Sequence, residues 1–206
     1  MTDWSIPIDK LNDYLTELNP VYHNVGRSII MPSGSGKSYW MKNLQDTTYG
    51  NWKKIPKHSF IDSDPLMIAS GAMPPLEGEN LSGLNWKEHM KQICERCDMV
   101  TVKCKEKGLW LMGATWWDPT LVDAFVVLPE ELNKKYLKGK GDVGEGFNEN
   151  YYERELKPYI ENNIRPLAKD FGVPIFDSIE SCAMFIIRSD NAVSSNRSQN
   201  DIKYKF

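Results

Sequence analysis

The segment 27–38 constrains the fold of this chain more than any other part of the sequence. Arg27–Met31 is a short apolar run typical of a buried strand, and a Pro-Ser-Gly-Ser-Gly turn follows it at once. Lys37–Leu44 then has the pattern of a helix. Gly34 and Gly36 let the backbone curl so that successive N–H groups point into one concavity. The segment therefore predicts a strand, an anion-sized turn and a helix, in that order.

Four further apolar runs, with helical patterns between most of them, extend this alternation along the chain. The runs predict strands at 59–62, 109–112, 123–128 and 173–176, and apolar spacing predicts helices at 6–18, 86–107, 130–140, 151–171 and 179–187. Residues 65–85 contain Pro, Gly and Met without periodicity and predict a loop-rich insertion. Short apolar strands alternating with helices indicate an α/β domain built on a parallel sheet.

The composition is that of an ordinary globular protein. Of its 206 residues, 41% are hydrophobic and 26% are charged, and the formal net charge of -3 excludes a basic coat for wrapping nucleic acid. The apolar stretches are far shorter than a bilayer requires, and the first residues lack the basic and apolar regions of a signal peptide. We expect a cytoplasmic protein without a membrane partner.

The glycine-rich turn resembles the phosphate-binding loop of P-loop NTPases, G-x-x-x-x-G-K-[ST], and differs from it only at the first position. Met31 stands at that position, where a bulky side chain fits if it points into the core. The resemblance implies that Lys37 bridges the β- and γ-phosphates of ATP and that the Ser38 hydroxyl binds Mg²⁺. The residues that it implies for nucleotide binding are Ser33, Gly34, Ser35, Gly36, Lys37, Ser38 and Tyr39.

Acidic residues follow the second predicted strand, in the order Phe60-Ile-Asp-Ser-Asp64. This segment resembles the F-x-D-x-D-like element of the small-molecule P-loop kinases, such as shikimate and gluconate kinases. The resemblance implies that Asp62 and Asp64 orient the metal and act as general base, with Asp62 on Mg²⁺ and Asp64 near the acceptor. The alternative interpretation is that Asp64-Pro65 only caps the following turn or helix.

The same kinases place a mobile lid with cationic residues after the fourth strand, and residues 129–150 occupy that window here. Lys135 and Lys138 are the ATP-binding candidates among several lysines that are followed by glycines. Arg154 begins a segment that resembles the R-x-P-L-Y-x-E-type element after the lid, and this implies a role on the acceptor or the phosphate. A solvated lysine face and an ordinary surface arginine are the alternatives.

The resemblance implies the three-layer, nucleotide-kinase-like fold, with a five-stranded parallel sheet in the order 2-3-1-4-5. We expect one domain over residues 1–188, with an N-terminal helical extension at 1–22 and an acceptor-side insertion at 65–85. The polar residues 189–206 are expected to form a loose tail.

The sequence constrains the acceptor of the phosphoryl group less than it constrains the donor, ATP. Trp116 and Trp117 follow the third strand, where they stack a base or only pack in the core. Arginines, which usually hold an acceptor phosphate, are few, and this favours a hydroxyl on a nucleoside, a nucleotide or a nucleic acid (a 5′ end or a modified base). The alternatives are a nucleoside monophosphate kinase, a sugar-acid kinase and a non-catalytic module gated by nucleotide.

The four cysteines leave two interpretations. Cys94 and Cys97 have C-x-x-C spacing inside a predicted helix, but no second ligand pair follows. His89 or Cys104 would have to complete a metal site. Reduced core thiols are the favoured interpretation.

Overall fold

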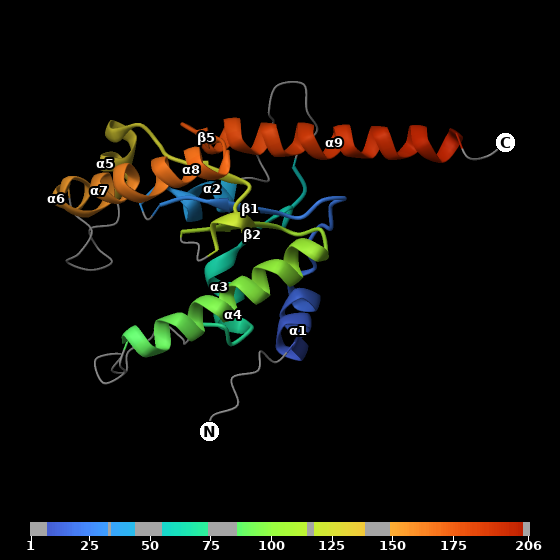
Figure 1. Ribbon diagram of the computed structural model, residues 1–206, viewed down its shortest axis with the longest axis horizontal. Coiled ribbons are helices and arrows are strands. Elements are labelled where there is room, and N and C mark those ends of the chain that lie inside the picture. Colours follow the sequence, from blue (N-terminus) through green and yellow to red (C-terminus); the bar gives the residue numbers. More distant parts are fainter. Residues whose placement is uncertain are drawn as a thin grey trace.

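The computed structural model contains a sheet of five parallel strands (Figure 1). The structure describes residues 8–32, 34–43, 55–73, 86–114, 118–138 and 149–203. The sheet order is β2-β3-β1-β4-β5, which confirms the predicted order. The strands are β1 (Arg27–Ile30), β2 (Phe60–Asp62), β3 (Trp110–Gly113), β4 (Ala124–Val126) and β5 (Ile175–Phe176).

Helices cover both faces of this sheet. They are α1 (Ile8–Leu18), α2 (Lys37–Asn43), α3 (Ser63–Ala69), α4 (Trp86–Glu106), α5 (Glu130–Lys138), α6 (Glu149–Tyr151), α7 (Lys157–Tyr159), α8 (Arg165–Phe171) and α9 (Ile179–Lys203). A 3₁₀ turn, Pro119–Leu121, precedes β4, and two π-helical stretches, Tyr152–Leu156 and Ile160–Ile164, join α6, α7 and α8 into one rod. Among the described residues, no helix is both long and apolar enough to span a membrane.

Alternating side chains of the strands build a core on each face. In β1, Ile29 packs with α2 and α9 on one face, whereas Ile30 packs with α5 and the α6–α8 rod on the other. Leu111 of β3 joins α1, α3 and α4 in a third apolar cluster. Figure 1 shows the resulting layers, with α9 above the sheet and α4 and α1 below it.

The connections between the strands pass over opposite faces of the sheet on either side of β1. The chain that leaves β1 enters α2 on one face, but α4 and the α6–α8 rod, which lead into β3 and β5, pack on the opposite face. In open α/β sheets, ligands bind beyond the carboxyl ends of strands where connections diverge in this way. The glycine-rich turn after β1 lies at such a point.

Two predicted elements differ from the structure. The predicted loop at 65–85 is wrong over its first part, because α3 continues to Ala69. Pro65 is tolerated there because it lies in the first turn, where a missing N–H breaks no helical hydrogen bond. The predicted loose tail is also wrong, since α9 continues to Lys203. The rest of the insertion, 74–85, lies outside the described residues.

His23 gives the fold a testable dependence on pH. Its ring stacks on Trp110 with centroids 3.5 Å apart, and its Nε2 donates to the Ser59 carbonyl at 3.1 Å. Burial lowers the pKa of His23, and the Ser59 carbonyl and Asp190 only partly oppose this. The unfolded chain therefore binds the proton more readily than the folded chain does. The neutral His23 ring contributes to stability above the ordinary histidine pKa, and this contribution is lost as the pH falls below it.

We expect the free energy of unfolding to decrease between about pH 7.5 and pH 5.5, on either side of the ordinary histidine pKa. The His23→Phe variant should show a smaller decrease over the same range, as measured by urea unfolding. The same decrease in both proteins would exclude His23 as a source of the pH dependence.

Candidate functional site

The candidate site is centred on Lys37, which is held between two carboxylates. Its Nζ donates to Asp62 Oδ1 and to Asp64 Oδ2, both at 2.5 Å. The Lys37 side chain is 12% exposed, whereas the Asp64 side chain is 46% exposed. Lys37, which directly follows the glycine turn, thus contacts both acidic residues after β2, which lie 25 or more positions further along the sequence.

The sheet brings these residues together. β1 and β2 are parallel, so the turn after β1 and the acids after β2 meet at the same edge, with β3 between the two strands. Gly34 and Gly36 adopt φ values of 86° and 73°, a region that other residues rarely adopt. These conformations turn the chain from β1 into α2, which starts at Lys37.

Asp62 has a second role as the N-cap of α3. Its Oδ1 accepts the backbone N–H of Asp64 at 3.1 Å, so one carboxylate both caps the helix and binds Lys37. The capping interpretation was partly right, but the capping residue is Asp62 rather than Asp64. The cap fixes where α3 begins and therefore where the Asp64 side chain leaves the helix.

A pocket of about 600 Å³ opens beside the glycine turn. Residues of the turn and of α2 line it, together with Asp64 and two residues of α5, Lys135 and Tyr136. Ser38 and Tyr39, both predicted to bind nucleotide, are exposed and line this pocket. The preceding Met31 is only 1% exposed and packs in the core on the α2 face. The bulky residue at the start of the turn therefore points into the core, as expected.

Helix α5 packs directly on the glycine turn. The buried Ser35 hydroxyl donates to Asn133 Oδ1 at 3.4 Å, and Asn133 Nδ2 donates to the Leu128 carbonyl at 2.9 Å. A Cβ on Gly34 would lie 2.5 Å from Leu137 Cδ2, so α5 approaches the turn too closely for a larger residue. The predicted lid segment therefore begins with a helix that braces the turn.

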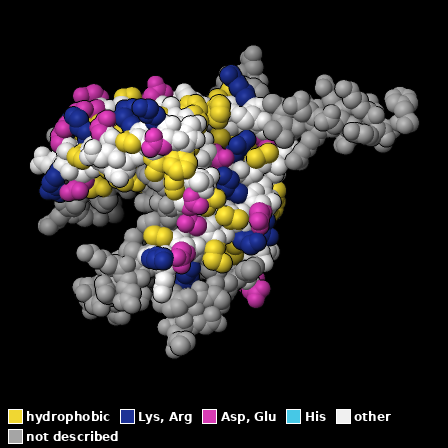
Figure 2. All heavy atoms as spheres, in the orientation of Figure 1, with side chains coloured by type: hydrophobic (Ala, Val, Ile, Leu, Met, Phe, Trp, Pro, Cys, Tyr) yellow, Lys and Arg dark blue, Asp and Glu magenta, His cyan; other side chains and the backbone are white. Residues whose placement is uncertain are grey.

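Unlike Lys135, two further cationic side chains of this region lie away from the pocket. Arg154 is on the helical rod, its side chain is 67% exposed, and its Nε donates to the neighbouring Glu155 at 3.2 Å. It does not line the described part of the pocket beside the glycine turn, and its role on the acceptor or phosphate stays a prediction. Lys134 is bound by Glu130 and Glu153. Figure 2 shows basic and acidic side chains mixed over this end of the molecule.

Three predicted residues cannot be placed, and one is placed differently. Ser33, Trp116 and Trp117 lie outside the described residues. Lys138, at the end of α5, is exposed but does not line the pocket beside the glycine turn.

Sequence analysis missed several residues of the site. Asn133 and Tyr136 lie among the lysines of the predicted lid and were not recognised as site residues. An Asn inside an otherwise amphipathic helix is nevertheless a signal of a buried hydrogen bond.

Tyr14 of α1 was also missed. Tyr14 packs on the apolar cluster that contains Leu66 and Met67, so α1 lies against α3, the helix that carries Asp64. Burial raises the pKa of Tyr14, and the negative charge of Asp62 raises it further.

The cysteines fit the favoured interpretation. All four are free thiols; Cys97, Cys104 and Cys182 are buried and Cys94 is partly buried. Burial raises the pKa of Cys104 and of Cys182 to about 12, which keeps both protonated. Within the described ranges, no group of three or more His, Cys, Asp or Glu side chains is arranged to hold a metal.

Comparisons with known proteins do not extend this description. No protein family model matches the chain, and neither the curated proteins nor the solved structures include a match to it.

Proposed function

We propose that this protein is an ATP-dependent kinase of the P-loop type, which transfers the γ-phosphoryl group to a hydroxyl of a nucleoside, a nucleotide or a nucleic acid. The observation that carries the proposal is the position of Lys37. It follows a glycine turn at the carboxyl end of β1, contacts Asp62 and Asp64, and borders a pocket of about 600 Å³. Pockets for small ligands and cofactors have this size.

The turn supplies the groups that bind phosphate. The first N–H groups of a helix have no partner inside the helix, and those of α2 begin directly after the turn. Lys37 adds a positive charge that its two carboxylates hold at the mouth of the pocket. When triphosphate binds, we expect Lys37 to exchange part of this contact for the β- and γ-phosphates.

The oxygen donors near the turn fit magnesium. Mg²⁺ in phosphate-transfer sites is bound through one or two protein oxygens together with substrate phosphates, so a cluster of protein ligands is not required. The exposed Ser38 hydroxyl and the Asp62 carboxylate are such donors. These residues would hold Mg²⁺ against the phosphates, where it would supply charge neutralisation.

Asp64 is the general base in this proposal. Its carboxylate borders the phosphate pocket and is the more exposed of the two acids. The acceptor O–H gives its proton to Asp64 as the new O–P bond forms, and the bond to the β–γ bridging oxygen breaks, so that ADP leaves with the electron pair. Lys135 of α5 faces the same pocket and is positioned to contact the phosphates.

The alternatives have less support. A nucleoside monophosphate kinase needs arginines at the acceptor, but neither Arg96 nor Arg154 lines the described part of a pocket that contains Asp64. In a non-catalytic nucleotide-gated module, Asp62 would point away from the phosphates, whereas here it contacts Lys37.

The Asp64→Asn variant tests the assignment of the base. Asn cannot take up the proton, so we expect turnover to fall by about 100-fold or more, while the affinity for ATP·Mg²⁺ changes by less than about threefold. Single-turnover transfer from labelled ATP and equilibrium binding of a non-hydrolysable analogue measure the two effects separately.

Asp170→Asn is the matched control, since Asp170 is an exposed aspartate on α8. It should leave both quantities unchanged. If Asp64→Asn lowers turnover and ATP affinity by the same factor, or changes neither, Asp64 is not the base.

A further inference from the structure

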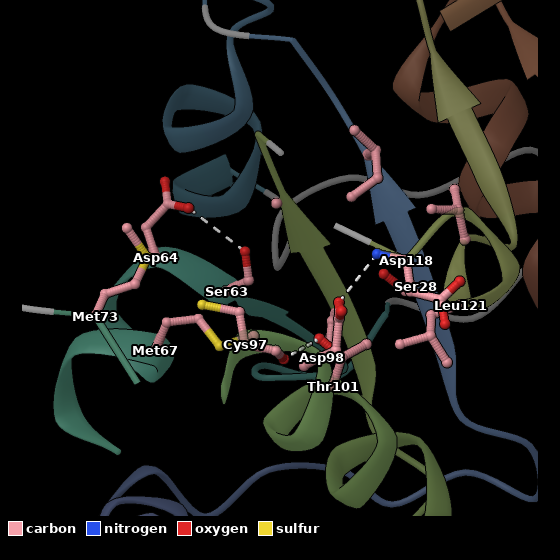
Figure 3. A pocket seen from close by; sticks show the side chains of 14 residues that line it. Ser28, Ser63, Asp64, Met67, Met73, Cys97, Asp98, Thr101, Asp118 and Leu121 are labelled. Atoms are coloured by element: carbon pink, nitrogen blue, oxygen red, sulfur yellow. Dashed lines mark hydrogen bonds between the residues drawn. The ribbon is translucent and has the colours of Figure 1, made fainter. Parts of the chain in front are cut away.

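A second pocket lies on the other side of Asp64. It is bounded by β1, β3, α3, α4 and the turn before β4, and its volume is about 40 Å³, room for about three water-sized groups. Asp64 lines both this pocket and the larger one beside the glycine turn. Figure 3 shows Asp64 and Met67 of α3 on one side of it, and Asp98 and Asp118 on the other.

The Asp, Glu, Lys and Arg side chains in the described part of this lining are all acids. They are Asp64, Asp98 and Asp118, and no Lys or Arg is among the described residues that line the pocket. A phosphate ester carries a charge of about -1.5 to -2 at neutral pH, so the carboxylates of Asp98 and Asp118 would repel it, whereas Asp64 is paired with Lys37. This pocket therefore disfavours an acceptor that presents a phosphate.

Two hydroxyl groups of the lining, those of Thr101 and Ser63, are already used as donors. Thr101 Oγ1 donates to the Cys97 carbonyl at 2.9 Å, and Ser63 Oγ donates to Asp64 Oδ1 at 3.4 Å (Figure 3). These two hydroxyls and the carboxylates therefore present mostly acceptor oxygens to a ligand. A ligand that donates hydrogen bonds, as an alcohol does, matches such a surface.

Asp98 is held in place at the back of this pocket. Its Oδ1 accepts the backbone N–H of Asp118 at 3.1 Å, which fixes the carboxylate between α4 and the turn before β4. Burial raises the pKa of Asp98; the Asp118 N–H opposes this, and the negative charges of Asp118 and Glu95 add to the rise. A hydrogen-bond donor from a ligand would offset this cost of burying a carboxylate.

We propose that this pocket admits the acceptor as an uncharged alcohol, such as a CH₂OH group, and that Asp98 determines this specificity by accepting its hydrogen bonds and by repelling phosphate. The proposal rests on the kinase function proposed above. It places the acceptor hydroxyl beside Asp64, where the two pockets adjoin. The acceptor oxygen attacks the γ-phosphorus directly while Asp64 takes its proton, and the bond to the β–γ bridging oxygen breaks, so that ADP leaves with the electron pair.

The test offers ATP·Mg²⁺ with matched pairs of acceptors: nucleosides against their 5′-monophosphates, and oligonucleotides with a 5′-hydroxyl or a hydroxymethylated base against 5′-phosphorylated ones. We expect kcat/KM for an alcohol to exceed that for its phosphorylated counterpart by about 100-fold or more. Asp98→Asn keeps an oxygen for the Asp118 N–H. It should raise KM for the alcohol by about tenfold or more, with kcat and ATP affinity within about threefold.

Asp13→Asn, an exposed aspartate on α1, is the control and should change none of these quantities. Transfer that prefers the phosphorylated acceptors, or an unchanged alcohol KM in Asp98→Asn, would overturn the specificity proposal while the kinase function stands. Absence of transfer to every acceptor would overturn both.

Discussion

The Lys37→Ala variant should lose phosphoryl transfer by about 1,000-fold or more, because removal of one preorganised charge on the transferred group costs this much in comparable sites. Among the described residues, Lys37 is the only Lys or Arg that forms an ion pair with Asp62 or Asp64. Without it, the two carboxylates face the incoming phosphates with no cation between them. The affinity for ATP should therefore decrease as well, unlike in Asp64→Asn.

The control for this variant is Lys169→Ala, which removes an exposed lysine of α8 and should keep wild-type turnover and ATP affinity. Thermal unfolding followed by circular dichroism shows whether Lys37→Ala is folded. A folded Lys37→Ala protein with unchanged transfer would contradict the phosphate-binding assignment of the glycine turn.

The Gly108→Ala variant should have the largest effect on stability. Gly108 has φ 80° and joins α4 to β3, and a Cβ there would lie 2.0 Å from the backbone oxygen of His23. Because that oxygen belongs to the backbone, the segment before β1 would have to move. The His23 N–H also donates to the Gly108 carbonyl at 2.8 Å, and this bond holds the segment in place. We expect a loss of more than about 3 kcal/mol in the free energy of unfolding.

The Gly172→Ala variant separates the two causes of the expected loss, which are the contact with the His23 backbone and the left-handed conformation. Gly172 ends α8 with φ 65°, but a Cβ there would have no heavy atom within 4 Å. This variant should therefore lose only the cost of the left-handed conformation, about 1–2 kcal/mol. Urea unfolding of both variants measures the difference, and equal losses would show that the contact with His23 contributes nothing.

The parallel sheet could be predicted because each strand is short, apolar and separated from the next by a crossover, whereas its order was expected from the resemblance to the P-loop kinases. Side chains of β1 such as Ile29 and Ile30 are buried on opposite faces, which is why the run lacks the alternation of a half-exposed strand. The limits of the helices were less predictable. α9 continues through a polar sequence to Lys203, where composition alone favoured a tail.

Part of the site could be predicted as well. Lys37 was found from the phosphate-loop motif, and Asp62 and Asp64 from the resemblance to the F-x-D-x-D-like element. They meet in the structure because strand ends of a parallel sheet lie at one edge, whatever their separation along the chain. Asp98 could not be found in this way. It lies in the middle of α4, where an acid usually faces solvent, and only the packing of α4 against β3 turns it toward Asp64.

Arg154 lies away from the pocket beside the glycine turn for a physical reason. Its segment forms a helical rod with π-helical stretches around Pro158, and the rod buries Tyr152 and Leu156 against the sheet. Arg154 lies between these two residues in the sequence and is left exposed. The resemblance matched residue types in the segment, but the face that each residue takes depends on packing that spacing alone does not specify.

The most direct test of the proposed function is transfer of labelled γ-phosphoryl from ATP·Mg²⁺ to pooled acceptors, with Lys37→Ala as the blank. The pools are nucleosides, nucleoside monophosphates, DNA or RNA with 5′-hydroxyl ends or modified bases, and sugar acids. The proposed kinase should label a hydroxyl of a nucleoside, nucleotide or nucleic acid and release ADP, and the blank should not. Tight binding of ATP without transfer to any pool and without hydrolysis would contradict the kinase and favour a nucleotide-gated binding module.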